Sequence, residues 1–316
     1  MNVFITRQIP EIAEQILKHH GFKISVFKKD RPITRKELIA NGKDADALIT
    51  LLTDKIDKNI IDQFTKCRII ANYAVGYNNI DFDYAKSRNI IVTNTPDVLT
   101  HATADLAVTL ILACARHVVQ GDKMVRKGKF VGWKPKLMLG IELRRKTVGI
   151  VGAGRIGQET AKRMKAFGTK VVYYDTIHKL DFEKETGARM VSLDRLLKSS
   201  DIISIHLPLT DRTLHLIDKQ RLKLIKNDAI LVNTARGEIV DENKLIKLLR
   251  SKKIFAAGFD VYTNEPHVNK ALFKLENVVL LPHLGSATFE ARNAMAELAV
   301  NNIINVMTGK KPITPV

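Results

Sequence analysis

A glycine-rich turn joins an apolar run to a helical stretch near the middle of the chain. The run Val148–Val151 is followed directly by residues 152–157, which read Gly-Ala-Gly-Arg-Ile-Gly, and then by the helical pattern Gln158–Phe167. In such a turn the three glycines serve the tight bend, the close approach of a diphosphate and the packing of the helix on the strand. The pattern therefore predicts a dinucleotide-binding site, in preference to a purely structural turn.

A carboxylate follows the next strand-like run. Val171–Tyr174 ends at Asp175, about 20 residues after the glycines, where the hydroxyl groups of an adenosine ribose bind and where a carboxylate repels a phosphate. Asp175 predicts NAD(H) as the cofactor and disfavours NADP(H). His178 and Lys179 lie close enough in sequence to leave phosphate binding open.

Length and composition exclude several classes of protein. A chain of 316 residues is long enough for two domains, and 45% hydrophobic residues with 9 prolines and 17 glycines exclude disordered and collagen-like classes. The first residues show no secretory signal, and the longest apolar run, Leu106–Ala115, is too short to span a bilayer. We expect a cytoplasmic protein without a membrane partner.

Charge and cysteine content point to no further partner. The net charge is +18, but the lysines are spread along the chain without interleaved aromatic residues. We therefore expect a solvated basic surface that attracts anionic substrates and cofactors, and no nucleic-acid binding. Cys67 and Cys114 lack metal-ligand spacing, so we expect core thiols and no metal site.

Two regions alternate apolar runs with helical patterns, as parallel sheets with connecting helices do. The runs of the first ~95 residues are Val3–Thr6, Ile24–Phe27, Ala47–Leu52, Arg68–Asn72 and Ile90–Thr93. Six runs between Thr147 and Leu281 match a complete dinucleotide-binding sheet: Val148–Val151, Val171–Tyr174, Ile202–Ile205, Ile230–Val232, Ala256–Phe259 and Val278–Leu281.

Three further segments connect or follow these regions. We predict a long helix over Ala102–Val119, an irregular basic loop or arm over Gly121–Lys146, and a last helix over Ala287–Thr308 that packs back on the first domain.

Candidate catalytic and substrate-binding side chains follow the later apolar runs of the second region. Ligands of open parallel sheets lie beyond the carboxyl ends of the strands, where Arg236, Glu265 and His283 occur. A guanidinium binds a carboxylate bidentately, an imidazole donates a proton near neutral pH, and a carboxylate orients that imidazole and raises its pKa. Each residue alone has an ordinary structural explanation, but together they predict a site that reduces a 2-oxo acid.

Two other segments end strands. His206 follows the third run and precedes Pro208, and we interpret this segment as backbone that lines the cofactor, with His206 not acting as an acid. The segment Asn72–Asp81 has two interpretations that spacing does not separate. Its N–H groups hold a substrate carboxylate, or it is a plain strand-to-helix turn capped by Asn79 or Asp81.

The ordered set of motifs resembles the D-isomer-specific 2-hydroxyacid dehydrogenase family, most of all its glyoxylate reductase branch. The motifs are Asn72–Asp81, Thr93–Thr100, Gly152–Gly157, Asn233–Gly237, Asn264–Pro266 and Pro282–Ser286. The resemblance implies an α/β fold of two doubly wound parallel-sheet domains. A flavodoxin-like substrate domain comprises residues 1–97 and 287–316, and a Rossmann NAD-binding domain comprises residues 98–286. Residues 120–146 are implied to form the dimerisation arm of a homodimer.

The same resemblance assigns site residues. It implies that Arg236, Glu265 and His283 are catalytic and that Leu52, Val75 and Gly76 bind the substrate together with Arg236. The implied cofactor-binding residues are Gly152, Gly154, Arg155, Ile156, Gly157, Asp175, His206, Pro208, Thr234, Ala235, Asp260, His283 and Gly285.

The expected activity is the NADH-dependent reduction of glyoxylate, and also of hydroxypyruvate. The alternatives are a D-lactate-type or phosphoglycerate-type dehydrogenase and, less favoured, an NAD-sensing interaction protein like the corepressors of this family. One departure bears on the cofactor. Some members of the glyoxylate reductase branch carry Ser-Arg-Thr after the second strand and use NADPH, whereas this chain has Asp-Thr-Ile at 175–177.

Overall fold

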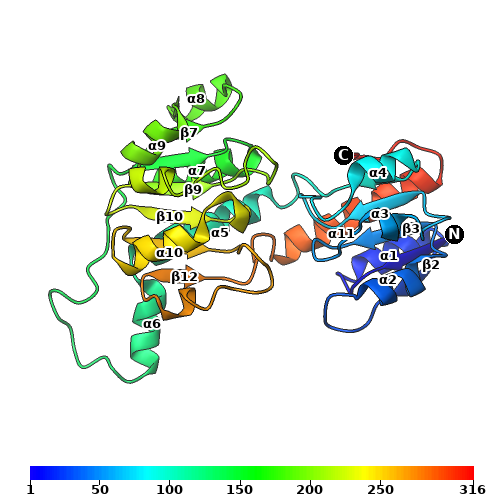
Figure 1. The fold of residues 1–316 in the computed structure, drawn as a ribbon, viewed down its shortest axis with the longest axis horizontal. Coiled ribbons are helices and arrows are strands. Elements are labelled where there is room, and N and C mark those ends of the chain that lie inside the picture. The colour runs from blue at the N-terminus through cyan, green and yellow to red at the C-terminus, as the bar shows by residue number, and fades with distance from the viewer. The chain divides into compact units, whose positions relative to one another are not determined.

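The computed structural model describes residues 1–316, which divide into two compact units (Figure 1). One unit comprises Met1–Leu99 and Ser286–Val316, and the other comprises Thr100–Gly285. Each unit has its own parallel β-sheet covered by helices, which confirms the predicted fold class.

The first unit contains five parallel strands in the order β2-β1-β3-β4-β5. This is the flavodoxin-like order, in which the strand sequence reverses between β1 and β3. The strands are β1 (Asn2–Ile5), β2 (Lys23–Val26), β3 (Ala47–Thr50), β4 (Ile69–Asn72) and β5 (Ile91–Thr93). Every residue of β3 and β4 is buried, as expected for central strands with helices on both faces.

Helices cover both faces of this sheet. On one face α1 (Ile12–His19) packs against α11 (Phe289–Met307), and α11 also contacts β3 and β4. The other face packs against α2 (Arg35–Gly42), α3 (Lys58–Ile61) and α4 (Phe82–Ser87). The C-terminal segment therefore completes the first unit, as the apolar pattern of the last helix predicts.

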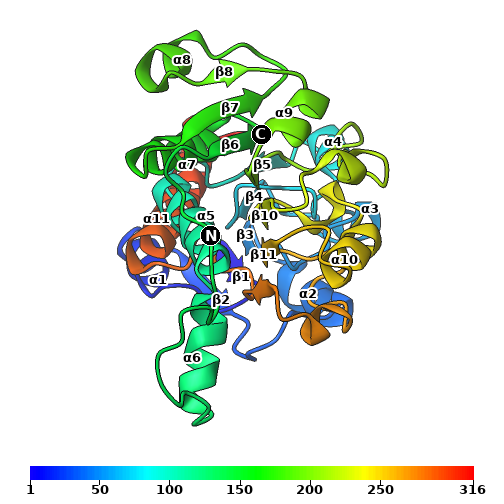
Figure 2. The same cartoon turned by 90° about the vertical axis from the view of Figure 1, so that its left-hand side faces the viewer.

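The second unit contains seven parallel strands in the order β12-β11-β10-β9-β6-β7-β8. They are β6 (Thr147–Val151), β7 (Lys170–Tyr174), β8 (Arg189–Met190), β9 (Ile202–Ile205), β10 (Ile230–Asn233), β11 (Ala256–Phe259) and β12 (Val278–Leu280). The six predicted strands are present, and β8 is additional. It has only two residues at the sheet edge beside β7, too few to produce an apolar run (Figure 2).

Two apolar clusters sandwich this sheet. One contains side chains of α5 (Thr100–Ala115) and α7 (Arg155–Ala166), which pack against each other. The other contains side chains of α9 (Leu193–Ser199) and α10 (Glu242–Arg250), while α8 (Leu180–Thr186) follows β7. Both cysteines are buried, and burial raises the pKa of each thiol to about 12.

The segment after α5 corrects the prediction of one long helix followed by irregular chain. Helix α5 ends at Ala115, His117 adopts a left-handed conformation with φ 52°, and α6 (Val118–Arg126) follows. Gly121 therefore lies inside a helix, where it costs about 1 kcal/mol relative to alanine. The ion pair of Asp122 with Arg126, one turn later, supports this helix, and a glycine-based boundary misses it.

No single helix has the length and apolar character needed to cross a membrane, and only the pair α5 and α6, bent by 64°, meets that test of length and composition together.

Candidate active site

The glycine turn after β6 gives each glycine a different environment. Gly152 has φ +98°, and a Cβ there would lie 2.9 Å from the carbonyl oxygen of His206. A Cβ on Gly157 would collide with the carbonyl oxygen of Gly152. Gly154 is the N-cap of α7, and a Cβ there would meet open space. The turn thus leaves room beside Gly154 at the N-terminus of a 12-residue helix, which fits the diphosphate of a dinucleotide.

Asp175 lies beside this turn, directly after β7. Its Oδ2 accepts a hydrogen bond from the N–H of Ala153 at 2.9 Å, and its Oδ1 accepts one from the N–H of Ile177 at 3.1 Å. The carboxylate is only partly buried, so it is accessible to ribose hydroxyl groups. His178 Nε2 lies 3.0 Å from Glu183 Oε1, and this carboxylate competes with any phosphate for the imidazole.

His206, after β9, lies in an environment that disfavours its charged form. Burial lowers the pKa of its imidazole to about 3, and Nε2 lies 2.8 Å from Ser204 Oγ. The ring is therefore neutral near pH 7. A neutral imidazole is a poor proton donor, so this environment does not favour His206 as the acid.

Asp260 holds the turn that carries His283. The side chain of Asp260 is fully buried after β11, where Oδ1 accepts from Leu284 N at 2.6 Å and Oδ2 accepts from Gly285 N at 2.8 Å. The carbonyl of Asp260 accepts from His283 N at 3.0 Å. His283 has φ 56°, a left-handed conformation that is uncommon for a side chain of this size. The three hydrogen bonds keep the backbone of residue 283 in this conformation.

His283 and Glu265 form a close pair. Nδ1 of His283 lies 2.7 Å from Glu265 Oε2, and Glu265 Oε1 accepts a hydrogen bond from Tyr262 N at 3.0 Å. Burial acts to raise the pKa of Glu265, but the hydrogen bond and the charge of His283 outweigh it, so the pKa lies below its ordinary value. With Nδ1–H donating to Glu265, Nε2 is the ring nitrogen available for proton transfer.

Arg236 follows β10, whose neighbour in the sheet is β11. Its Nη1 donates to the carbonyl of Ala235 at 2.7 Å, and no carboxylate oxygen accepts a hydrogen bond from the guanidinium. Burial lowers the pKa of this guanidinium, while the charges of Glu265 and Glu238 act to raise it. A partly buried guanidinium without a carboxylate partner suits the binding of an anionic substrate.

Sequence reasoning missed three residues that position this half of the site. The amide of Asn233 donates to the carbonyl of Arg236 at 2.8 Å and accepts from Ala235 N at 3.0 Å. Tyr262 holds Glu265 through its N–H, and Thr103 donates to the carbonyl of Gly285 at 2.9 Å. Asn233 is the polar end of an apolar run, a signal that sequence alone offers, whereas Thr103 comes from a distant part of the chain.

The first unit contains the other predicted substrate contacts. Leu52 lies in the loop after β3, and Val75 and Gly76 lie in the loop after the neighbouring β4. Asn79 ties the two loops together, because its amide donates to the carbonyls of Leu51 at 3.1 Å and Asp54 at 3.0 Å. Asp81 caps α4 through Tyr84 N, so the segment is a capped turn, and Asn79 is not the cap. The N–H groups of Val75 and Gly76 donate to no group of the protein.

Comparisons with known proteins agree with this arrangement. The model of the family described as D-isomer specific 2-hydroxyacid dehydrogenase, NAD binding domain, matches residues 108–285. The chain is 51% identical to a glyoxylate reductase of Pyrococcus furiosus in an alignment that covers 99% of this chain and 94% of the relative. The chain belongs to the D-isomer-specific 2-hydroxyacid dehydrogenase family.

Solved structures extend the likeness to the fold. A protein of Thermus thermophilus matches with a TM-score of 0.95 and 41% identity, covering 100% of both chains. An NADPH-dependent glyoxylate/hydroxypyruvate reductase of Sinorhizobium meliloti matches with a TM-score of 0.88 and 31% identity, covering 100% of this chain and 97% of that one. As a D-2-hydroxyacid dehydrogenase, the protein is an oxidoreductase with a nicotinamide dinucleotide cofactor.

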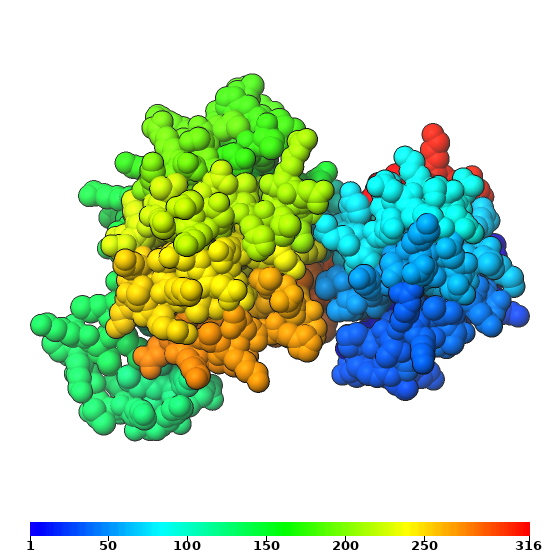
Figure 3. Space-filling model, in the orientation of Figure 1, coloured from blue at the N-terminus to red at the C-terminus, as the bar shows by residue number.

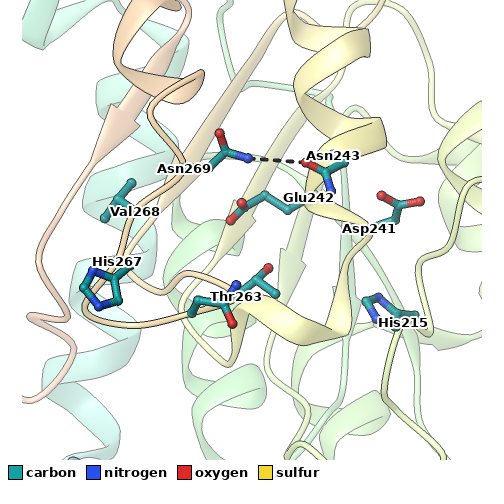
Figure 4. Close-up of a pocket in the computed structure, with 9 residues that line it drawn as sticks. His215, Asp241, Glu242, Asn243, Thr263, His267, Val268 and Asn269 are labelled. Carbon is teal, nitrogen blue, oxygen red and sulfur yellow. Dashed lines mark hydrogen bonds between the residues drawn. The ribbon is translucent and has the colours of Figure 1, made fainter.

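A small hollow of the dehydrogenase lies outside the residues described above. It measures about 320 Å³ and is lined by His215, Asp241, Glu242, Asn243, Thr263, Asn264, His267, Val268 and Asn269 (Figure 4). Asn269 donates to Asn243 across it at 3.3 Å. Arg236, Glu265 and His283 do not line it, so this hollow is not the predicted catalytic centre.

The different surroundings of Gly154 and Gly157 give a testable prediction. We expect Gly154→Ala to keep the melting temperature of the wild type but to weaken NADH binding at least tenfold, because the new methyl group occupies the space that a diphosphate approaches. Gly157→Ala is the matched control and should lower the melting temperature by several degrees through its clash with Gly152. Thermal unfolding and NADH fluorescence titration measure both effects. Unchanged NADH affinity in Gly154→Ala would contradict this placement of the diphosphate.

Proposed function

We propose that this dehydrogenase reduces glyoxylate, and also hydroxypyruvate, to the corresponding 2-hydroxy acid with NADH. The observation that carries the proposal is the His283–Glu265 pair, whose 2.7 Å contact lies in the same unit as Arg236 and the dinucleotide turn. The names of the relatives support the substrate: the Pyrococcus protein is a glyoxylate reductase, and the Sinorhizobium enzyme is a glyoxylate/hydroxypyruvate reductase.

Each residue has a defined task in the proposed reaction. The bound nicotinamide supplies the hydride. Arg236 holds the substrate carboxylate and polarises the adjacent carbonyl group. His283 donates the proton on Nε2 to the carbonyl oxygen, which becomes the hydroxyl group. Glu265 accepts the hydrogen bond from Nδ1 and fixes the orientation of the ring.

The proposal assigns roles to the two units. Residues 1–97 and 287–316 form the substrate domain, in which the N–H groups of Val75 and Gly76 bind the carboxylate and Leu52 limits the size of the substrate. Residues 98–286 form the cofactor domain, in which Thr234, Ala235, Asp260 and Gly285 lie toward the nicotinamide.

The proposed activity is tested by NADH oxidation with glyoxylate, hydroxypyruvate, pyruvate and phosphohydroxypyruvate. We expect glyoxylate to give the highest kcat/KM among the four. His283→Gln should lower kcat about 10²–10⁴-fold, the usual contribution of general acid catalysis. His267→Gln, which changes a nearby exposed histidine, is the control and should leave kcat unchanged. A loss of less than tenfold in His283→Gln would show that His283 is not the proton donor.

The coenzyme preference rests on Asp175. A ribose 2′-phosphate placed beside this carboxylate meets like-charge repulsion, whereas ribose hydroxyl groups donate hydrogen bonds to it. We expect the wild type to use NADH with a kcat/KM at least tenfold above that for NADPH, and Asp175→Ser to reduce this ratio. Thr176→Ala is a control at the neighbouring position that keeps the carboxylate. Equal kcat/KM values for the two coenzymes in the wild type would contradict the preference.

We also propose that the protein is a homodimer joined through residues 120–146 and the helical residues just before them. This part of the second unit projects from the body of that unit (blue-green in Figure 3). It exposes large apolar side chains: Val118, Val119, Val125, Phe130, Val131, Trp133 and Leu139. Trp133 is 83% exposed and Val131 is 80% exposed, more than a monomer usually tolerates over one continuous segment. A second copy, related by twofold symmetry, covers both arms at once.

Sedimentation velocity tests the dimer. We expect the wild type to sediment at about twice the mass of its 35.5 kDa chain, and the double variant Val131→Ser with Trp133→Ser to shift toward the monomer. Phe273→Ser removes another exposed aromatic residue outside the arm and should leave the dimer intact. A monomeric wild type would refute the proposed dimer.

A further inference from the structure

Three consecutive carbonyl groups in the loop after β4 are held by donors of the first unit. The carbonyl of Ala74 accepts from Thr95 N at 2.9 Å. The carbonyl of Val75 accepts from Asn94 Nδ2 at 2.8 Å, and the carbonyl of Gly76 accepts from Asn72 Nδ2 at 2.9 Å. Side-chain amides thus fix two peptide groups that no regular secondary structure holds.

Holding a carbonyl also orients the next N–H group. In a planar trans peptide the C=O of one residue and the N–H of the next point in opposite directions. The bond to Ala74 therefore directs the N–H of Val75 away from Thr95, and the bond to Val75 directs the N–H of Gly76 away from Asn94. The N–H groups of Val75 and Gly76 donate to no group of the protein. Two adjacent free N–H groups with fixed directions are suited to binding an anion.

The two asparagines are themselves held in place. Asn72 is fully buried, and its Oδ1 accepts from Thr50 Oγ1 at 3.0 Å, which leaves Nδ2 as the donor toward Gly76. Asn94 pairs with the C-terminal segment, because its N–H donates to the carbonyl of Thr314 at 3.3 Å and its carbonyl accepts from Thr314 Oγ1 at 2.7 Å. Neither side chain needs to touch a ligand to exert this effect.

We infer that Asn94 is a positioning residue that orients the backbone N–H group of Gly76 toward a substrate carboxylate, while Asn72 fixes the next peptide group, between Gly76 and Tyr77. The inference rests on the proposed function, in which Val75 and Gly76 bind that carboxylate. It adds the reason why this loop presents donors to the ligand: the N–H of Thr95 and the side chain of Asn94 bind the carbonyl groups of Ala74 and Val75 on the opposite side. Loss of the Asn94 amide frees the peptide group between Val75 and Gly76 to rotate, and a carbonyl oxygen then repels the carboxylate.

The test compares Asn94→Ala and Asn94→Asp with wild type. We expect Asn94→Ala to raise KM for the 2-oxo acid about tenfold, the effect of ~1.4 kcal/mol, with kcat changed less than threefold and the NADH Kd unchanged. Asn94→Asp keeps the size of the side chain but places an acceptor against the carbonyl of Val75, so KM should rise further. Asn305→Ala is the matched control, since this partly buried amide also donates to a main-chain carbonyl, that of Lys311, in the same unit.

Calorimetric titration with oxamate separates this inference from the proposed function. Oxamate is a carboxylate that resembles a 2-oxo acid but is not reduced. If the wild type binds oxamate in the presence of NADH but reduces no 2-oxo acid, the proposed function fails. Weaker oxamate binding by the Asn94 variants then still supports the positioning role. Unchanged KM and oxamate affinity in both Asn94 variants would overturn it. So would wild-type protein that binds no oxamate, or a parallel loss of NADH affinity and melting temperature in the variants.

Discussion

The geometry of the candidate site depends on one buried carboxylate. Asp260 accepts hydrogen bonds from the backbone N–H groups of Leu284 and Gly285, and its own carbonyl accepts from His283. These contacts hold His283 in a left-handed conformation and present its ring to Glu265. A peptide carbonyl or a water molecule would accept hydrogen bonds from the same N–H groups less strongly than an ionised carboxylate does, because hydrogen bonds to a charged acceptor are about twice as strong as neutral ones. The position of the proposed proton donor therefore depends on a residue that does not transfer the proton.

The same solution recurs at other strand ends. Asn233 at the end of β10 binds the backbone of Ala235 and Arg236, and Asn72 at the end of β4 binds that of Gly76. In the loop after β3, Asp54 accepts from Leu51 N at 2.8 Å and from the hydroxyl of Thr6. In a parallel sheet the last residue of a strand is still buried, whereas the next residues leave the hydrogen-bonding pattern of the sheet. A buried polar side chain at that point satisfies the departing backbone and fixes the loop that carries the functional groups.

Sequence patterns predicted the parts of the fold that burial on both faces determines. Central strands such as β3 and β10 are continuous apolar runs, and they occur within one or two residues of the predicted bounds. The two-residue edge strand β8 and the exposed helix α6 lack such a pattern, and the prediction missed both. The positions of Arg236 and His283 followed from the rule for strand ends, but the partners of Asn94 did not. Its contact with Val75 depends on the path of two loops 19 residues apart, which local periodicity does not encode.

Two carboxylates of the site have opposite effects on stability. Because burial raises the pKa of Asp260, its charged form opposes folding at pH values above that pKa, and the penalty disappears as pH falls below the pKa of the unfolded chain. Glu265 has a lowered pKa, so its contribution favours folding above the pKa of the unfolded chain and is lost as pH falls through the folded value. The two carboxylates are not independent, because the charge of Glu265 also acts to raise the pKa of Asp260. Removing Glu265 therefore relieves part of the penalty on Asp260 while it releases His283, so stability and proton transfer are linked through these two carboxylates.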